Sequence, residues 1–115
     1  MKKTSLVPPL STAVTYILLS LAERDLHGYG IMLETSRLSG GDYKMGPGTL
    51  YDNLKSLMAN GLVTEVEVAE AAEETRRLYR LTQAGAAVLA DELKRLEQVV
   101  LAGRRRLAGG QVREV

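Results

Sequence analysis

The 115-residue chain contains no cysteine, tryptophan or phenylalanine, and His27 is its only histidine. The absence of cysteine excludes disulfides, thiolate metal sites and a cysteine nucleophile, and it fits a reducing cytoplasm. A single histidine excludes metal sites that need two imidazole ligands. We therefore expect no metal and no cofactor. Because these absences remove most catalytic groups, we do not expect an enzyme.

The sequence also lacks a long apolar run and a strong charge of either sign. Its longest mainly apolar stretch, residues 13–22, is too short to span a bilayer. Pro8-Pro9 stand where a secretion signal would have its apolar core, so we expect a cytoplasmic protein with no membrane partner. The formal net charge is +1, so any basic surface must be local.

Helical and strand periods alternate along the chain. Apolar residues recur at helical spacing from 11 to about 23, from 28 to 37 and from 47 to 60, and residues 43–45 suggest a very short strand. The period then changes to two in a hairpin, before a fourth helix begins. We expect an α+β, mainly α fold consisting of an N-terminal arm (1–10), a winged helix-turn-helix domain (11–81), a C-terminal dimerisation helix (82–108) and a tail (109–115).

The third expected helix has a polar face opposite its apolar stripe. Thr49 can donate to a phosphate or touch a thymine methyl, Tyr51 on the flank can donate its hydroxyl, and Lys55 adds positive charge. Asp52 would repel phosphates unless it accepts from a cytosine amino group. A solvent-facing surface of an ordinary amphipathic helix is the alternative interpretation. The polar face comprises Gly48, Thr49, Asp52, Lys55 and Ser56.

The hairpin carries arginines that suit a DNA-contacting wing. Arg76, Arg77 and Arg80 could neutralise backbone phosphates. The alternative is that they pair with the hairpin's own carboxylates, of which the segment from 61 to 81 holds five, against three arginines. The sequence leaves both interpretations open.

The fourth helix has an apolar seam that is too long for one small domain to cover. The spacing of the seam, 4, 3 and 4 residues, resembles a heptad and favours pairing with a second copy of the same helix. Folding back onto its own domain is the alternative. The seam consists of Leu89, Leu93, Leu96 and Val100.

The start of the second helix has two unusual features. Gly28 and Gly30 weaken the helix and suggest either the close approach of another backbone or a frayed helix start. His27, alone before the helix, is interpreted as a cap or a packed structural residue rather than a catalyst.

Several strings together resemble the PadR-like transcriptional regulators. They are His27-Gly28-Tyr29, then Gly48-Thr49-Leu50-Tyr51, then Arg77-Leu78-Tyr79-Arg80-Leu81-Thr82, and the similarity spans about residues 10 to 100. The resemblance implies a dimeric bacterial winged-helix repressor that binds operator DNA. It also implies that Thr49, Tyr51 and Lys55 face the DNA, and that Tyr43, Arg76 and Arg77 contact its backbone.

The resemblance further implies that a small hydrophobic effector could bind in a pore between two subunits. In this sequence the pore lining would be Ala13, Tyr16, Ile17, Leu93, Leu96 and Val100. A second hypothesis remains open, in which the chain is a winged-helix interaction module that binds a partner protein and has little DNA affinity. Asp52, the acidic wing and the near-neutral charge motivate that alternative.

Overall fold

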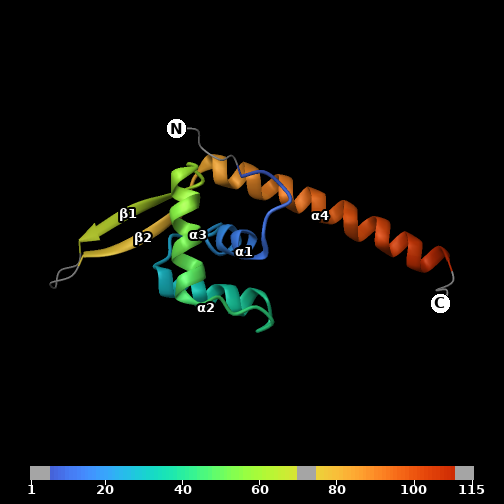
Figure 1. Ribbon diagram of the computed structural model, residues 1–115, viewed down its shortest axis with the longest axis horizontal. Helices are drawn as coiled ribbons and strands as arrows, with labels where there is room; N and C mark the ends of the chain where they lie inside the picture. Colours follow the sequence, from blue (N-terminus) through green and yellow to red (C-terminus); the bar gives the residue numbers. More distant parts are fainter. Residues whose placement is uncertain (1–5, 70–74, 111–115) are drawn as a thin grey trace.

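The computed structural model describes residues 6–69 and 75–110, and within them four helices and a two-stranded antiparallel sheet (Figure 1). The elements follow the expected order and confirm the mainly helical α+β fold. They are α1 (Thr12–Ser20), α2 (Gly28–Leu38), α3 (Pro47–Ala59), β1 (Val63–Ala69), β2 (Thr75–Leu81) and α4 (Gln83–Gly109). Residues 1–5 of the expected arm, the hairpin tip and residues 111–115 of the tail lie outside the described residues.

Local capping chemistry fixes several helix ends. The Ser11 hydroxyl accepts a hydrogen bond from the Val14 N–H at the start of α1, and Thr82 serves α4 in the same way. Pro47 occupies the first turn of α3, and Gly61 follows that helix with a positive φ of 75°. The expected end of α1 near residue 23 was wrong, because the chain leaves the helix at Leu21 and turns there while Leu21 stays buried.

The core lies where α1, α2, α3 and the base of the sheet meet. The apolar stripes expected from helical spacing point into it, and Ile17, Ile31 and Leu50 are fully buried. Burying side chains of this size stabilises the fold by about 1.5–3 kcal/mol each. This packing fixes α3 at the surface, with its polar face directed outward.

The two strands form the wing, with Val63 opposite Leu81 and Ala69 opposite Thr75. Leu26 extends the sheet by one residue: its N–H donates to the Tyr79 carbonyl and its carbonyl accepts from the Tyr79 N–H. The very short strand expected at 43–45 was wrong. That segment is a loop, held by the Ser39 hydroxyl, which accepts a hydrogen bond from the Tyr43 N–H. The residue that pairs with the edge of the sheet is Leu26 and not this segment.

A buried carboxylate ties the first half of α4 to the segment that precedes α1. Glu92 is only 2% exposed, and its carboxylate accepts hydrogen bonds from the Leu10 N–H at 3.3 Å and from the Arg95 guanidinium at 2.9 and 2.8 Å. These bonds compensate for its burial. Hydrogen bonding by Arg95 lowers the pKa of Glu92, although burial acts in the opposite direction.

The lowered pKa of Glu92 predicts a pH-dependent contribution to stability. The unfolded carboxyl binds its proton at a higher pH than the folded one, so the contribution is present above about pH 4.5 and is lost as pH falls through the folded pKa. We expect Glu92→Gln to be less stable than the wild type at pH 7 and the difference to shrink towards pH 3. Urea unfolding between pH 7 and pH 3 measures this difference in the free energy of unfolding. The exposed substitution Glu97→Gln is the control. A constant difference would contradict the prediction.

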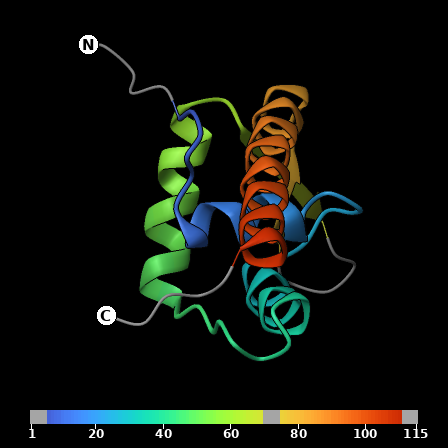
Figure 2. The same cartoon turned by 90° about the vertical axis from the view of Figure 1, so that its right-hand side faces the viewer.

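The structure corrects part of the expected interface. Ile17 is 0% exposed, and Ala13 and Leu89 are also buried within the chain's own core, so they cannot line a surface shared with a second copy. The sequence pattern placed them on an apolar face but could not show which partner covers it. The distal half of α4 extends away from the other elements (Figures 1 and 2). The apolar side chains exposed along α4 are Leu93 and Leu96 near its middle and Val99, Val100, Leu101 and Leu107 in its distal half.

Candidate nucleic-acid interface

The outer face of α3 carries the residues singled out from the sequence. Gly48, Thr49, Asp52 and Lys55 are all exposed on this helix, opposite its buried leucines. The Gly46–Pro47 start leaves the N-terminal N–H groups of α3 without a side-chain cap. This end of the helix therefore offers unpaired donors and the positive end of the dipole to an anion.

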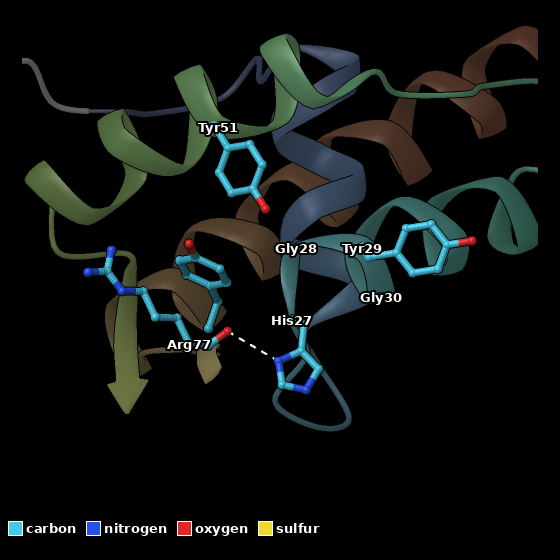
Figure 3. Close-up of a pocket in the computed structure, with 7 residues that line it drawn as sticks. His27, Gly28, Tyr29, Gly30, Tyr51 and Arg77 are labelled. Carbon is cyan, nitrogen blue, oxygen red and sulfur yellow. Dashed lines mark hydrogen bonds between the residues drawn. The ribbon is translucent and has the colours of Figure 1, made fainter. Parts of the chain in front are cut away.

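The Tyr51 side chain does not point outward with the polar face of α3. Its hydroxyl is directed from α3 towards the start of α2, and it lies so close to Gly28 that a Cβ at position 28 would collide with it (Figure 3). The expectation that another backbone approaches Gly28 was wrong, because a tyrosine side chain fills that space. Gly30 likewise faces the side chain of Leu26 at ordinary contact distance.

A pocket of about 640 Å³ opens beside Tyr51, between α2, α3 and the wing (Figure 3). We call it the tyrosine pocket. The His27 Nδ1–H donates a hydrogen bond of 3.3 Å to the Arg77 carbonyl, which ties the start of α2 to β2. His27 stands at the N-cap of α2 but gives it no side-chain cap, so of the two predicted roles, a cap or a structural residue, the structure shows the second. The pocket is lined by His27, Gly28, Tyr29, Gly30, Tyr51, Arg77 and Tyr79.

Tyr79 is the most buried of the polar residues that line the tyrosine pocket. Its side chain is 6% exposed, and its backbone is fixed by the paired bonds with Leu26. Burial raises the pKa of Tyr79, and the nearby Glu65 carboxylate adds to the rise, so the phenol stays protonated and can donate. Its hydroxyl is not among the buried side-chain atoms of the described residues that lack a hydrogen-bond partner.

The wing arginines are already partly paired. Arg77 lies 3.4 Å from the Glu65 carboxylate, as the alternative interpretation of the wing predicted. Arg80 pairs instead with Asp25 in the loop before α2, through bonds of 3.1 and 2.7 Å. Arg76 is placed in β2 opposite Val68, but its side chain lies outside the described part, as do the glutamates of the hairpin tip.

Tyr43 is half-buried in the loop before α3. Its ring stacks on Tyr16 of α1, with the centroids 5.6 Å apart and the planes 20° from parallel. This stack was not foreseen, because the two residues are far apart in sequence and belong to different expected sites. It positions the loop that leads into α3.

A second cavity, of about 360 Å³, lies between α1 and the first half of α4. Tyr16, Leu93 and Leu96 line it, and all three were expected to line an effector site. Glu92 and Arg95 add a polar wall that the sequence pattern did not reveal, since a glutamate on a helix is usually solvent-exposed.

Two further properties concern the described residues alone. No helix in the described ranges has a stretch apolar and long enough to cross a bilayer. Within the same ranges, no three side chains among His, Cys, Asp and Glu gather as a metal site would require.

A family model and a curated relative both match this chain to transcriptional regulators. The chain matches the PadR-like family of transcriptional regulators over residues 17–91. It is 39% identical over 97 residues to transcriptional regulator Rv3488 of Mycobacterium tuberculosis, covering 84% of this chain and 82% of that protein.

Solved structures share the fold. A transcriptional regulator from Clostridium thermocellum superimposes with a TM-score of 0.69 at 24% identity, covering 82% of this chain and 91% of that one. Bacillus subtilis PadR, solved in complex with operator DNA, gives a TM-score of 0.66 at 26% identity, covering 74% of this chain and 48% of that one. The chain thus belongs to the PadR-like family of transcriptional regulators, a family of regulators and not of enzymes.

Proposed function

We propose that the chain binds operator DNA in the cytoplasm as a homodimeric repressor, with α3 in the major groove and the wing along the backbone. The observation that carries this proposal is the exposed polar face of α3, with Thr49 and Lys55 beside an uncapped helix start. Membership of the PadR-like family supports it, as does the similarity to B. subtilis PadR, which was crystallised with operator DNA.

Each α3 residue has a distinct role in this proposal. Thr49 contacts a base edge or a phosphate at the helix tip, and Lys55 contacts the backbone. Gly48 allows the helix tip to approach the groove closely. Asp52, exposed on the same face, accepts from a cytosine amino group. Arg77 reaches the backbone after leaving Glu65, and Arg76 and Tyr43 remain predicted backbone contacts.

The second copy pairs along the distal half of α4. This half has a row of exposed apolar side chains and projects beyond the domain that would otherwise cover it (Figure 1). A two-fold pair of this kind addresses half-sites about 34 Å apart, one turn of the double helix. The cavity between α1 and α4 lies next to the pairing surface, and a small hydrophobic effector bound there would change the spacing of the two α3 helices.

The test is a binding titration on an operator that the wild-type protein selects from random duplexes. We expect Thr49→Ala to weaken operator binding by about 5- to 100-fold with little change on unrelated DNA, because the variant cannot read that base. Lys55→Ala should weaken binding to all sequences and reduce the salt slope by about one, because one backbone phosphate is no longer neutralised. Fluorescence anisotropy at several salt concentrations measures both.

Lys94→Ala is the matched control, because it removes the same charge from an exposed position of α4. Its salt slope should equal that of the wild type. Failure of the wild type to bind any duplex at low salt would refute the proposal and favour the interaction-module hypothesis. In that case Asp52→Arg would create DNA affinity where the natural chain has none.

A further inference from the structure

We propose that the stacked rings of Tyr16 and Tyr43 transmit occupancy of the cavity between α1 and α4 to the start of α3 within a single chain. The inference rests on the proposed function, which places a small hydrophobic effector in this cavity and DNA against α3. The stack gives such an effector a second route of action, separate from any change in the spacing of two copies.

Tyr16 belongs both to the cavity and to the stack. Its side chain lines the cavity of about 360 Å³. Its ring also lies against the ring of Tyr43, with the centroids 5.6 Å apart. Both side chains are half-buried and pack against the core. A molecule in the cavity that displaces the ring of Tyr16 therefore also changes the contact that holds the ring of Tyr43.

Only a short segment separates Tyr43 from the reading helix. Gly46 is the N-cap residue of α3, and its carbonyl accepts a hydrogen bond of 3.0 Å from the Leu50 N–H. Met45, buried between Tyr43 and Gly46, keeps any displacement of this segment small. Because two residues alone lie between Tyr43 and Gly46, a shift of Tyr43 reaches the first turn of α3.

Two attachments of different kinds hold Tyr43 in place. On the side of α2, the Ser39 hydroxyl accepts a hydrogen bond of 3.0 Å from the Tyr43 N–H and lies 3.2 Å from the Tyr43 carbonyl, to which it can donate. On the side of α1, the attachment is the stack with Tyr16. Hydrogen bonds are directional, whereas aromatic pairs tolerate centroid separations of about 4.5 to 7 Å. The stack is therefore the attachment that an occupant of the cavity can change.

The strength of the stack limits the size of the effect. An aromatic pair changes an equilibrium by about 2- to 10-fold beyond the effect of the area that it buries. A ligand cannot shift an equilibrium by more than its differential interaction with the two states. Separation of the rings can therefore weaken DNA binding by no more than about tenfold through this route.

The test places an occupant in the cavity by covalent attachment, because the chain has no cysteine of its own. Thr12 is exposed, lines the cavity and lies one helical turn before Tyr16. Thr12→Cys labelled with benzyl methanethiosulfonate brings a phenyl ring to Tyr16, and a reducing agent removes it again. Amide hydrogen exchange of Leu50, measured without DNA, reports on the first turn of α3. We expect the label to accelerate this exchange several-fold and reduction to restore it.

Lys94→Cys with the same label is the matched control, because Lys94 is an exposed position of α4 outside the cavity lining. Its label should leave the exchange of Leu50 unchanged. Tyr43→Leu removes one ring of the stack and should abolish the response to the Thr12 label, whereas Tyr43→Phe keeps the ring and should preserve the response. Each variant is compared with its own unlabelled form. Tyr16→Leu removes the other ring and replaces Tyr43→Leu if that variant does not fold.

Operator binding by the labelled protein separates this inference from the proposed function. A loss of up to about tenfold that Tyr43→Leu eliminates would support the coupling. A loss that persists in Tyr43→Leu would show that the occupant acts through the spacing of two copies, which overturns the inference and leaves the proposed function intact. Accelerated exchange of Leu50 in a protein that binds no duplex would support the coupling and refute the proposed function. An unchanged exchange rate of Leu50 would overturn the inference.

Discussion

Replacing Gly85 by alanine is expected to lower the free energy of unfolding by about 3 kcal/mol. Gly85 is in the first turn of α4, where its N–H donates to the Thr82 hydroxyl. A Cβ there would overlap the Leu62 carbonyl and stand 2.7 Å from Leu81 Cδ1. The carbonyl cannot move away freely, because it accepts a hydrogen bond of 3.1 Å from the Thr82 N–H. The whole wing-to-α4 junction would have to shift.

Gly103→Ala is the matched control for this prediction. It lies in the same helix, and a Cβ there meets nothing within 4 Å. Because alanine favours helix more than glycine, this variant should gain up to about 1 kcal/mol. Urea unfolding followed by circular dichroism measures both. Changes of the same sign would show that the close approach at Gly85 does not constrain the fold.

Val100→Asp is expected to separate the proposed dimer and to weaken operator binding at least about 100-fold. The side chain is 47% exposed in the single chain and belongs to the apolar row on the distal half of α4. A carboxylate there leaves the core of the chain untouched. It would place two uncompensated charges in an apolar pairing surface, and two-site binding would become one-site binding.

Gln98→Asp provides the control, since it introduces the same charge at an exposed polar position of α4. Sedimentation velocity at micromolar concentration measures the oligomeric state, and anisotropy on the selected operator measures affinity. A dimer that survives Val100→Asp with unchanged affinity would place the pairing surface elsewhere. A wild type that sediments as a single chain would remove the homodimer from the proposed function.

Much of the fold could be predicted from the sequence because its signals are local. Ser11, Pro47, Gly61 and Thr82 act within one helical turn, and the change of apolar period marks the wing. The sheet contribution of Leu26 could not be predicted, since one residue has no period. The length of α4 could be predicted, but not which of its apolar residues the chain covers itself.

For the candidate site too, the features that depend on local sequence could be predicted, and those that depend on the tertiary fold could not. The polar face of α3 could be predicted, because residues on one helix keep a fixed angular relation. The tyrosine pocket could not, because its lining comes from three segments that only the tertiary fold brings together. The closely spaced glycines at 28 and 30 were the available signal, and they indicated a close approach without identifying Tyr51.

The buried carboxylate of Glu92 has a consequence for how α4 leaves the domain. Two apolar surfaces can slide past each other by a fraction of an ångström with little change in free energy. The Glu92 carboxylate accepts one directional hydrogen bond from outside its own helix, from the Leu10 N–H, while Arg95 of α4 holds the carboxylate in place. The position of α4 against the segment before α1 is therefore fixed by a directional bond as well as by apolar packing, and a molecule that disturbed this bond would change the direction in which the distal half of α4 leaves the domain.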